Sequence, residues 1–299
     1  MKIIFLSLLL LGSNLFSQRQ KLLYKKINDS TFSVINENNI EIVPPFTTLI
    51  TYNDKEEIKD NIIYIADAKN WENYYVDREG NYLFDAYMYD NGPDYERERS
   101  LRYKDKNGKV GLADPDGNIL IAAKYDYLSF QNFGFSYYCN GCYFDRSKDS
   151  EHPPLVGAKT FGYVDRLGKE IQTNKKKNHP KDYAVEGGRF IPYQRVYTDY
   201  EMKILNMLQK YSKRINQMNI SEGTDLVFEI ITRPNPTHPY YFIKLYRKER
   251  DSTFSTDSDD AVGFSFLADE KGNLFINHLE HKDKVFTYTI IPLEDWFKP

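Results

Sequence analysis

Short apolar segments alternate with a recurring turn signature along most of the chain. The signature reads Asp-x-x-Gly and is followed by Asn or Lys. An Asp at the start of such a turn accepts backbone N–H groups two residues on, and Gly takes the positive φ that other residues resist. Because apolar residues flank the turns, each unit is predicted to be a strand, a tight turn and a second strand. The signature residues are Asp77 and Gly80, Asp105 and Gly108, Asp114 and Gly117, Asp165 and Gly168, and Asp269 and Gly272.

One segment in the second half has helical periodicity instead. Thr198 and Glu201 form a capping-box sequence at its start, with Tyr197 and Met202 placed as a hydrophobic staple. We predict one amphipathic helix that ends within residues 219–223. Its apolar stripe is expected to pack on the protein's own sheet, and the alternative is a partner-binding face. The stripe consists of Tyr197, Tyr200, Ile204, Leu208, Tyr211, Ile215 and Met218.

Five strand candidates follow this helix. The connection between the first two contains three prolines, which cannot take part in a strand ladder. Short connections of this kind suit antiparallel neighbours. The expected fold class is therefore mainly β with an α+β C-terminal domain, in which one amphipathic helix packs on an antiparallel meander. The strand candidates are residues 226–232, 240–246, 262–268, 274–279 and 285–291.

The flanks of two turns carry a longer pattern. Residues 110–135 read Val-Gly-Leu-Ala-Asp before the turn, Gly-Asn-Ile-Leu-Ile after it, then Lys-Tyr-Asp-Tyr-Leu, and close on Phe-Gly-Phe. Residues 161–169 open a second copy, and residues 40–46 match the end of an earlier one. This order resembles the WG (KWG) repeat family in degenerate form, since Val110 and Phe161 stand in place of the namesake Trp. Over residues 36–172 the resemblance implies stacked β-hairpin units, and it implies no enzyme activity.

The N-terminal residues predict export. Lys2 precedes an apolar stretch over residues 3–11, a polar break follows, and a cleavage point lies after Ser17. The stretch is too short to cross a bilayer, so a signal peptide over residues 1–17 is expected. The mature chain, which has no later stretch apolar enough to span a membrane, would be periplasmic, at the outer surface or secreted. We divide it into a repeat domain (18–174), a linker (175–188) and an α+β domain (189–299).

The composition limits the classes of binding partner that we expect. The net charge is −3, and no clustered excess of Lys and Arg marks a nucleic-acid-binding surface. The chain holds 25 Tyr and 19 Phe against 2 Trp. Tyr and Phe pack well across the strands of a sheet, and an aromatic-rich binding face is the sharper interpretation of the same excess.

Candidate chemistry is sparse. Cys139 and Cys142 are the two cysteines, and the Asn-Gly between them favours a tight turn. In an oxidising compartment a local disulfide is permitted, with unpaired thiols as the alternative and metal or redox use after that. Zinc would need further ligands such as His278 and His281, which lie in the other half of the chain, and we set it aside. No cofactor is expected.

Several familiar catalytic signatures do not occur. The sequence has no Gly-x-Ser-x-Gly elbow, phosphate loop or His-Glu-x-x-His motif. Residues 257–260 are acidic but lack the Gly and distant Glu of a calcium loop. We therefore expect a non-catalytic protein that binds an envelope protein or glycan. The alternatives are a hydrolase with a dispersed acidic site in the C-terminal domain and a redox or metal-handling protein centred on the cysteine pair.

Overall fold

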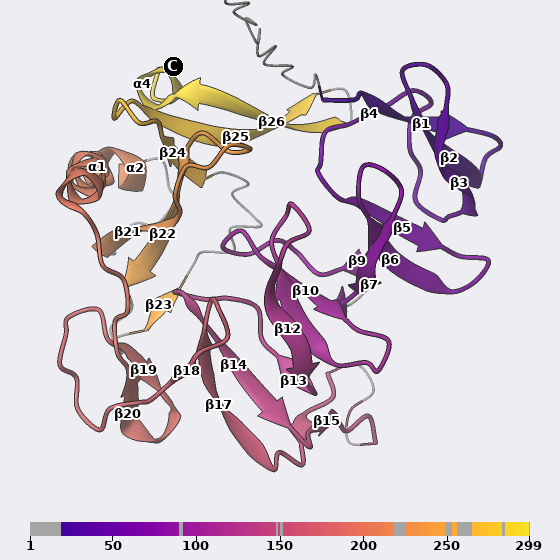
Figure 1. Ribbon diagram of the computed structural model, residues 1–299. Coiled ribbons are helices and arrows are strands. Elements are labelled where there is room, and N and C mark those ends of the chain that lie inside the picture. The colour runs from indigo at the N-terminus through magenta and orange to yellow at the C-terminus, as the bar shows by residue number, and fades with distance from the viewer. Residues whose placement is uncertain are drawn as a thin grey trace, which may run out of the picture. The chain divides into compact units, whose positions relative to one another are not determined.

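The computed structural model describes residues 19–89, 92–147, 149, 152–217, 225–248, 253–255, 265–282 and 285–298 (Figure 1). The chain forms two compact units, which divide between Tyr82 and Leu83. The predicted signal peptide lies outside the described residues.

The first unit is built from two antiparallel arrangements. Its four-stranded sheet has the order β3-β2-β1-β4, and β5 and β6 form a hairpin. Side chains from both arrangements share one core, in which Leu22, Phe32 and Ile65 are fully buried. The strands are β1 (Leu22–Lys26), β2 (Thr31–Asn36), β3 (Glu41–Thr47), β4 (Glu57–Ile58), β5 (Ile63–Asp67) and β6 (Glu72–Val76).

The second unit begins with short antiparallel strands. One set has the order β7-β10-β11-β12, and the next has the order β13-β14-β17-β18. Three smaller pairs join β8 to β9, β15 to β16, and β19 to β20. Strand β19 lies inside the predicted linker and is followed by the 3-10 helix η1. The bounds are β7 (Tyr82–Ala86), β8 (Met88–Tyr89), β9 (Gly92–Pro93), β10 (Leu101–Lys104), β11 (Val110–Ala113), β12 (Ile119–Tyr125), β13 (Tyr127–Leu128), β14 (Phe135–Asn140), β15 (Tyr143–Phe144), β16 (Leu155–Val156), β17 (Thr160–Asp165), β18 (Glu170–Ile171), β19 (Tyr183–Val185), η1 (Glu186–Gly188) and β20 (Arg189–Ile191).

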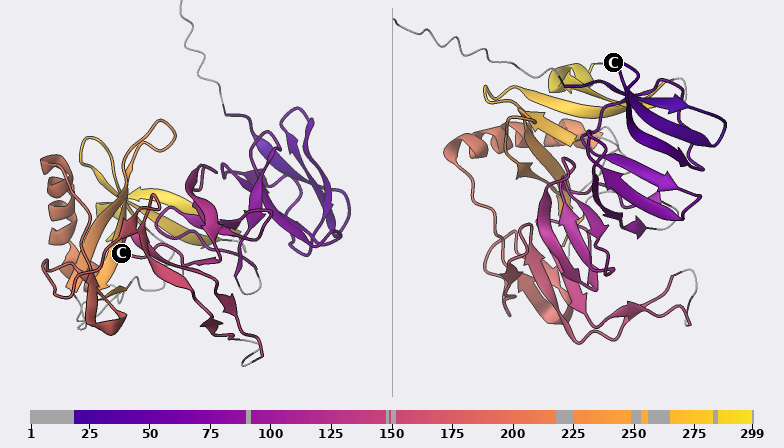
Figure 2. Two further views of the ribbon diagram at one scale, coloured as in Figure 1. Left: turned by 60° about the horizontal axis from the view of Figure 1, so that its bottom comes forward. Right: turned by 45° about the vertical axis from the view of Figure 1, so that its right-hand side comes forward.

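A larger antiparallel sheet completes the second unit. Its order β21-β22-β24-β25-β26 is the predicted meander, with β23 paired to β22 at the side. Helix α1 packs along this sheet, as the orange and salmon segments of Figure 2 show, and their side chains form one apolar core. The prediction of a mainly β fold with a helix on antiparallel strands is confirmed. The bounds are α1 (Asp199–Lys210), α2 (Ser212–Gln217), β21 (Asp225–Thr232), β22 (Tyr241–Lys248), β23 (Phe254–Ser255), β24 (Ser265–Ala268), β25 (Leu274–Lys282), β26 (Val285–Pro292) and α4 (Leu293–Trp296).

The predicted helix start is confirmed, but its continuity is wrong. Thr198 caps α1, and Glu201 returns the bond to the Thr198 backbone N–H. The helix stops at Lys210, and a second one begins at Ser212. Tyr211 lies between them as the C-cap of α1, donates its backbone N–H to the Leu208 carbonyl, and donates its hydroxyl to Glu294 while its ring stacks on Phe297. Met218 and the predicted helix end lie outside the described residues.

The Asp-x-x-Gly turns share one geometry. In each, the Asp Oδ1 accepts the backbone N–H groups of the second and fourth following residues, at 2.8–3.0 Å. Each Gly has a φ between +75° and +88°. At Gly80 a Cβ would also lie 2.2 Å from the Ile42 carbonyl oxygen. The turn therefore requires Gly both for its backbone conformation and, at this position, for space.

Candidate functional site

Strands β14 and β17 place aromatic residues on one face of their sheet. The two strands pair antiparallel, and Tyr137 lies directly opposite Tyr163 while Cys139 lies opposite Phe161. Because successive side chains alternate between faces, these residues share one side of the sheet. The Tyr137 ring centroid lies 5.9 Å from that of Tyr163 and 6.4 Å from that of Phe161. The two strands thus carry a cross-strand cluster of rings.

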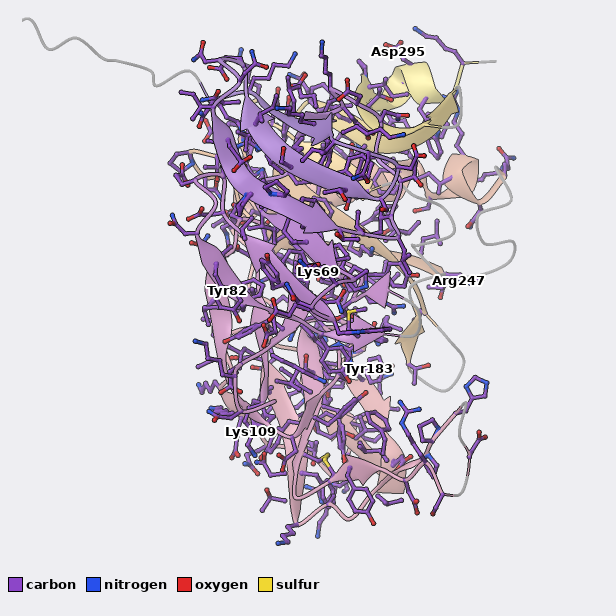
Figure 3. All side chains as sticks on the ribbon, turned by 90° about the vertical axis from the view of Figure 1, so that its right-hand side faces the viewer. Lys69, Tyr82, Lys109, Tyr183, Arg247 and Asp295 are labelled. Atoms are coloured by element: carbon purple, nitrogen blue, oxygen red, sulfur yellow. A yellow bond between two sulfur atoms is a disulfide. The ribbon has the colours of Figure 1, made fainter. Side chains whose placement is uncertain are left out.

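The cluster continues beyond the two strands at both ends. At one end Phe135 lies 5.8 Å from Tyr163 and 4.9 Å from Tyr183, whose position is labelled in Figure 3. At the other end Tyr127 lies 6.4 Å from Tyr137 and 5.6 Å from Phe144. We call this row the aromatic ladder; it comprises Phe144, Tyr127, Tyr137, Phe161, Tyr163, Phe135 and Tyr183.

Much of the ladder lines an open groove with a volume of about 1080 Å³. Phe161 is 66% exposed there, and Tyr137 and Tyr163 are half-buried. The segment around β19 and β20 supplies the facing wall, which includes Glu186 and Arg189. Further polar groups of the groove are Glu170, Gln172 and Thr173. We call this the aromatic groove: flat rings on its floor are bordered by hydrogen-bonding side chains.

The tyrosines of the groove keep their hydroxyl protons at neutral pH. The Tyr138 hydroxyl donates to Glu170 Oε1 at 2.6 Å, and this bond together with burial raises the pKa of Tyr138 to about 12. Burial, and after it the charge of Glu186, raises the pKa of Tyr137 and of Tyr163. The groove therefore offers neutral hydroxyls, which can both donate and accept hydrogen bonds.

A disulfide joins Cys139 to Cys142 near the end of β14. It closes the Asn140–Gly141 turn, where Gly141 has a φ of +75° and donates its N–H to Asp126 at 2.6 Å. Cys139 is fully buried beneath its strand neighbours. The bond therefore ties the β14 end of the ladder to the loop that leads to β15.

Apart from the aromatic groove, a cluster of polar side chains joins residues that lie far apart in the sequence. Glu98 accepts a bond from the Gly134 N–H at 2.9 Å and another from the Tyr246 hydroxyl. Glu229 is fully buried and accepts bonds from Lys181 at 2.5 Å and from Tyr193 at 2.7 Å. The Tyr197 hydroxyl also donates to Glu229.

Arg195 lies between these two carboxylates. Its Nη2 is 3.6 Å from Glu98 Oε2, and its Nε is 3.7 Å from Glu229 Oε2. Its Nη1 donates to the Ile230 carbonyl. Removing either carboxylate would leave the arginine charge poorly balanced in a buried setting, which is costly.

The turn that places the Glu98 carboxylate beside Arg195 has a strained backbone. Glu98 and Arg99 have φ values of 50° and 55°, in the left-handed region that few residues other than Gly adopt. They are the central residues of a tight turn that Arg97 and Ser100 close with backbone hydrogen bonds of 2.8 and 3.0 Å. Such strain persists only where the surroundings enforce it. Here the carboxylate contacts of Glu98 and the carbonyl contacts described next hold the turn in place.

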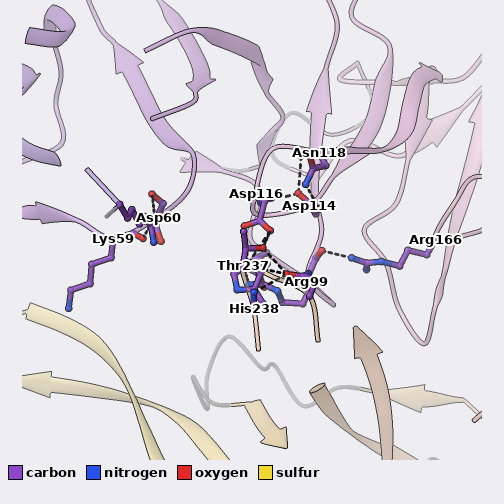
Figure 4. A network of polar contacts seen from close by, with 12 residues as sticks. Lys59, Asp60, Arg99, Asp114, Asp116, Asn118, Arg166, Thr237 and His238 are labelled. Carbon is purple, nitrogen blue, oxygen red and sulfur yellow. Dashed lines mark hydrogen bonds and ion pairs between the residues drawn. The ribbon is translucent and has the colours of Figure 1, made fainter. Parts of the chain in front are cut away.

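Two of the sequence-predicted turns contact the Glu98–Arg99 turn or its neighbour His238, and Figure 4 labels Arg99, Asp116, Arg166 and His238. Arg166, from the Asp165 turn, donates to the backbone carbonyls of Glu98 and Arg99. Asp116, from the Asp114 turn, contacts His238 Nε2 at 2.9 Å. The Asp105 turn contributes to neither the groove nor the cluster, and the Asp77 turn belongs to the first unit.

Sequence reasoning missed the Glu98–Arg195–Glu229 cluster. These residues come from a turn, the segment before α1 and strand β21, and no spacing motif links them. The one local signal was an isolated Glu within an otherwise apolar strand sequence at Glu229.

The described ranges contain neither a cluster of metal ligands nor a membrane-spanning helix. There, no three His, Cys, Asp or Glu side chains lie together as metal ligands. Nor does any helix in that part of the chain have the length and apolar character needed to cross a membrane. The side chains of His278 and His281 and the acidic residues 257–260 lie outside the described set.

Comparison with known proteins gives no family assignment. The chain matches no protein-family model, and a search of curated proteins finds no similar sequence. Functional inference therefore rests on the geometry of the two sites.

Proposed function

We propose that this is an exported, non-catalytic, WG-repeat-like protein of the cell envelope, and that its aromatic groove binds a glycan. The observation that carries the proposal is the aromatic ladder lining an open groove. Sugar rings present flat C–H faces that pack against aromatic rings, and their hydroxyls need hydrogen-bonding partners. The groove combines both, with Phe161, Tyr137 and Tyr163 as the flat surface and Gln172 and Arg189 among the polar groups.

A polypeptide segment is the second occupant to consider. Tyrosine-rich surfaces also bind proteins, because Tyr gives a large contact area at a small entropic cost. A glycan is favoured because the groove is long and open and offers rings and polar groups side by side. The proposal that the protein is exported rests on the predicted signal peptide over residues 1–17. The disulfide is compatible with an oxidising compartment.

The hydrolase alternative gains no support from the described carboxylates. Glu98 and Glu229 each accept hydrogen bonds from donors of the protein itself, so their oxygens are engaged within the fold. A general acid or base would need a proton to exchange with a substrate.

The test is binding of the full chain to insoluble envelope polysaccharide and to peptidoglycan, measured by co-sedimentation. Phe161→Ala removes the most exposed ring of the groove, and we expect affinity to fall by about tenfold, a loss typical of one aromatic stacking contact. Tyr95→Ala is the matched control, because Tyr95 is 59% exposed but does not line the groove.

Two outcomes would contradict glycan binding in the aromatic groove. Equal binding by both variants would place the glycan elsewhere. No glycan binding by the unaltered protein, together with Phe161-dependent capture of an envelope protein, would replace the glycan with a polypeptide.

A further inference from the structure

A partly open cavity of about 410 Å³ lies beside Arg195 in the second unit. Its walls include the rings of Phe133 and Tyr183 and the aliphatic side chains of Ile191 and Ile231. The volume suits a small ligand, since such sites usually occupy a few hundred cubic ångströms. We call it the Arg195 cavity. It shares Phe135, Ile171 and Tyr183 with the aromatic groove, but Arg195, Leu167 and Val196 line the cavity and not the groove.

Basic residues predominate among the charged groups of the cavity wall. Three of the four cations have carboxylate partners: Lys181 is bonded to Glu229, Arg233 lies 2.6 Å from Glu201, and Arg195 lies 3.6 Å from Glu98 and 3.7 Å from Glu229. Arg166 donates to the backbone carbonyls of Glu98 and Arg99. The charged lining residues are Arg166, Lys181, Arg195 and Arg233, with Glu98 and Asp165.

The acidic groups of the wall are already engaged. Glu98 accepts the Gly134 N–H and the Tyr246 hydroxyl. Asp165 accepts the N–H groups of its own turn, at 2.9 Å from Leu167. An anion in the cavity would therefore meet arginines rather than free carboxylates.

Arg195 keeps a hydrogen-bond donor in reserve. Within the described residues its buried Nε has no hydrogen-bond acceptor, and the nearest carboxylate, that of Glu229, is 3.7 Å away. This Nε has no surface open to the cavity; Nη2, which lies 3.6 Å from Glu98 Oε2 and beyond hydrogen-bond distance of it, is the nitrogen that can donate to a ligand. The planar guanidinium fork matches a carboxylate.

The mouth of the cavity is unexpectedly apolar. Leu167 is 75% exposed and Val196 is 83% exposed, and both line the cavity. Leu167 occupies the third position of an Asp-x-x-Gly turn, and the other four turns carry a polar residue there. Those residues are Glu79, Asn107, Asp116 and Lys271. The one turn that borders the cavity is thus the one with an aliphatic side chain at its tip.

We propose that the Arg195 cavity binds a small organic acid with an apolar body. Its carboxylate would bond to Arg195, while the apolar body would contact the aromatic wall and the Leu167–Val196 lip. This binding site is independent of the proposed glycan function, and either can fail without the other.

The test is calorimetric titration of the full chain with 4-phenylbutyrate and octanoate, each compared with its neutral amide. We expect each acid to bind at least about tenfold more tightly than its amide, because a charge-assisted hydrogen bond is lost in the amide. Inorganic phosphate should compete weakly, because it lacks an apolar body. Equal affinity of acid and amide, absence of acid binding, or competition by phosphate at the acid's own affinity would each overturn the proposal.

A variant pair avoids disturbing the buried charges. Leu167→Glu introduces a negative charge at the mouth, and Glu is the native residue at the equivalent position of the Asp77 turn, so the fold should persist. Leu167→Gln has nearly the same shape without the charge. We expect Leu167→Glu to weaken acid binding about fivefold relative to Leu167→Gln through charge repulsion. Equal acid affinities of the two variants would contradict the site, and amide binding should not distinguish them.

Discussion

At the residue scale, the protein commits its buried polar groups to specific partners. Burial, followed by the nearby charge of Glu229, raises the pKa of Tyr193 far above its usual value. Tyr246 is fully buried, and burial followed by the charge of Glu98 raises its pKa in the same way. These hydroxyls remain protonated and hold the two carboxylates in place. The sequence could not reveal this arrangement, because hydrophobic periodicity reports which residues are buried but not which buried polar groups meet.

One such bond predicts a pH effect. The pKa of Tyr138 is raised to about 12, from an ordinary value near 10, by its hydrogen bond to Glu170 and by burial. A raised folded-state pKa gives stability that is present below pH 10 and lost as the pH rises towards 12. Tyr138→Phe should therefore reduce the decline of unfolding free energy between about pH 10 and 12, measured by urea titration. Tyr95→Phe is the control, and an unchanged slope in Tyr138→Phe would show that other tyrosines account for the decline.

At the element scale, the motif glycines have two distinct roles. Turn glycines such as Gly108 adopt positive φ, whereas Gly111 lies within strand β11 and pairs directly with Tyr103. A Cβ at Gly111 would lie 2.6 Å from the Tyr103 ring and 2.5 Å from the Ile121 carbonyl oxygen. Gly162 repeats the arrangement opposite Tyr138, where a Cβ would lie 3.1 Å from the ring. The strand glycine thus makes room for a tyrosine ring on the neighbouring strand.

This difference predicts unequal costs for alanine substitution. A Cβ at Gly108 meets no atom within 4 Å, so Gly108→Ala should lower the unfolding free energy by about 1 kcal/mol through backbone strain alone. Gly111→Ala should cost about 3 kcal/mol because ring and carbonyl must both move. Chemical denaturation of the two variants measures both values, and equal costs would refute the separation of roles.

Element prediction from the sequence succeeded where local chemistry and periodicity agree. The capping box located the start of α1, and alternating apolar runs located the strands of the C-terminal meander. The break at Tyr211 was missed because the apolar stripe continues through it at helical spacing, and no Gly or Pro marks the C-cap there. The predicted WG-type resemblance remains a hypothesis about the origin of the repeated turns.

At the scale of the whole molecule, the second unit combines part of the repeat-like region with the α+β region. Phe133 and Phe135 from the former share an apolar cluster with Tyr246 and Phe254 from the latter. The hydroxyl of Tyr246 from the α+β region also donates to Glu98 of the repeat-like region. The aromatic excess of the sequence predicted an aromatic-rich surface in general terms, but the position of the aromatic ladder depends on the pairing of β14 with β17, which no local pattern specifies.

We propose that an envelope glycan binds in the aromatic groove. Hydroxyl-radical footprinting of the full chain, with and without bound envelope glycan, tests it most directly by mass spectrometry of the modified residues. We predict protection of Tyr137, Phe161 and Tyr163, while exposed Tyr95 should remain as reactive as in the free protein. Protection at Tyr95 or elsewhere, with the three groove residues unchanged despite bound glycan, would contradict the account.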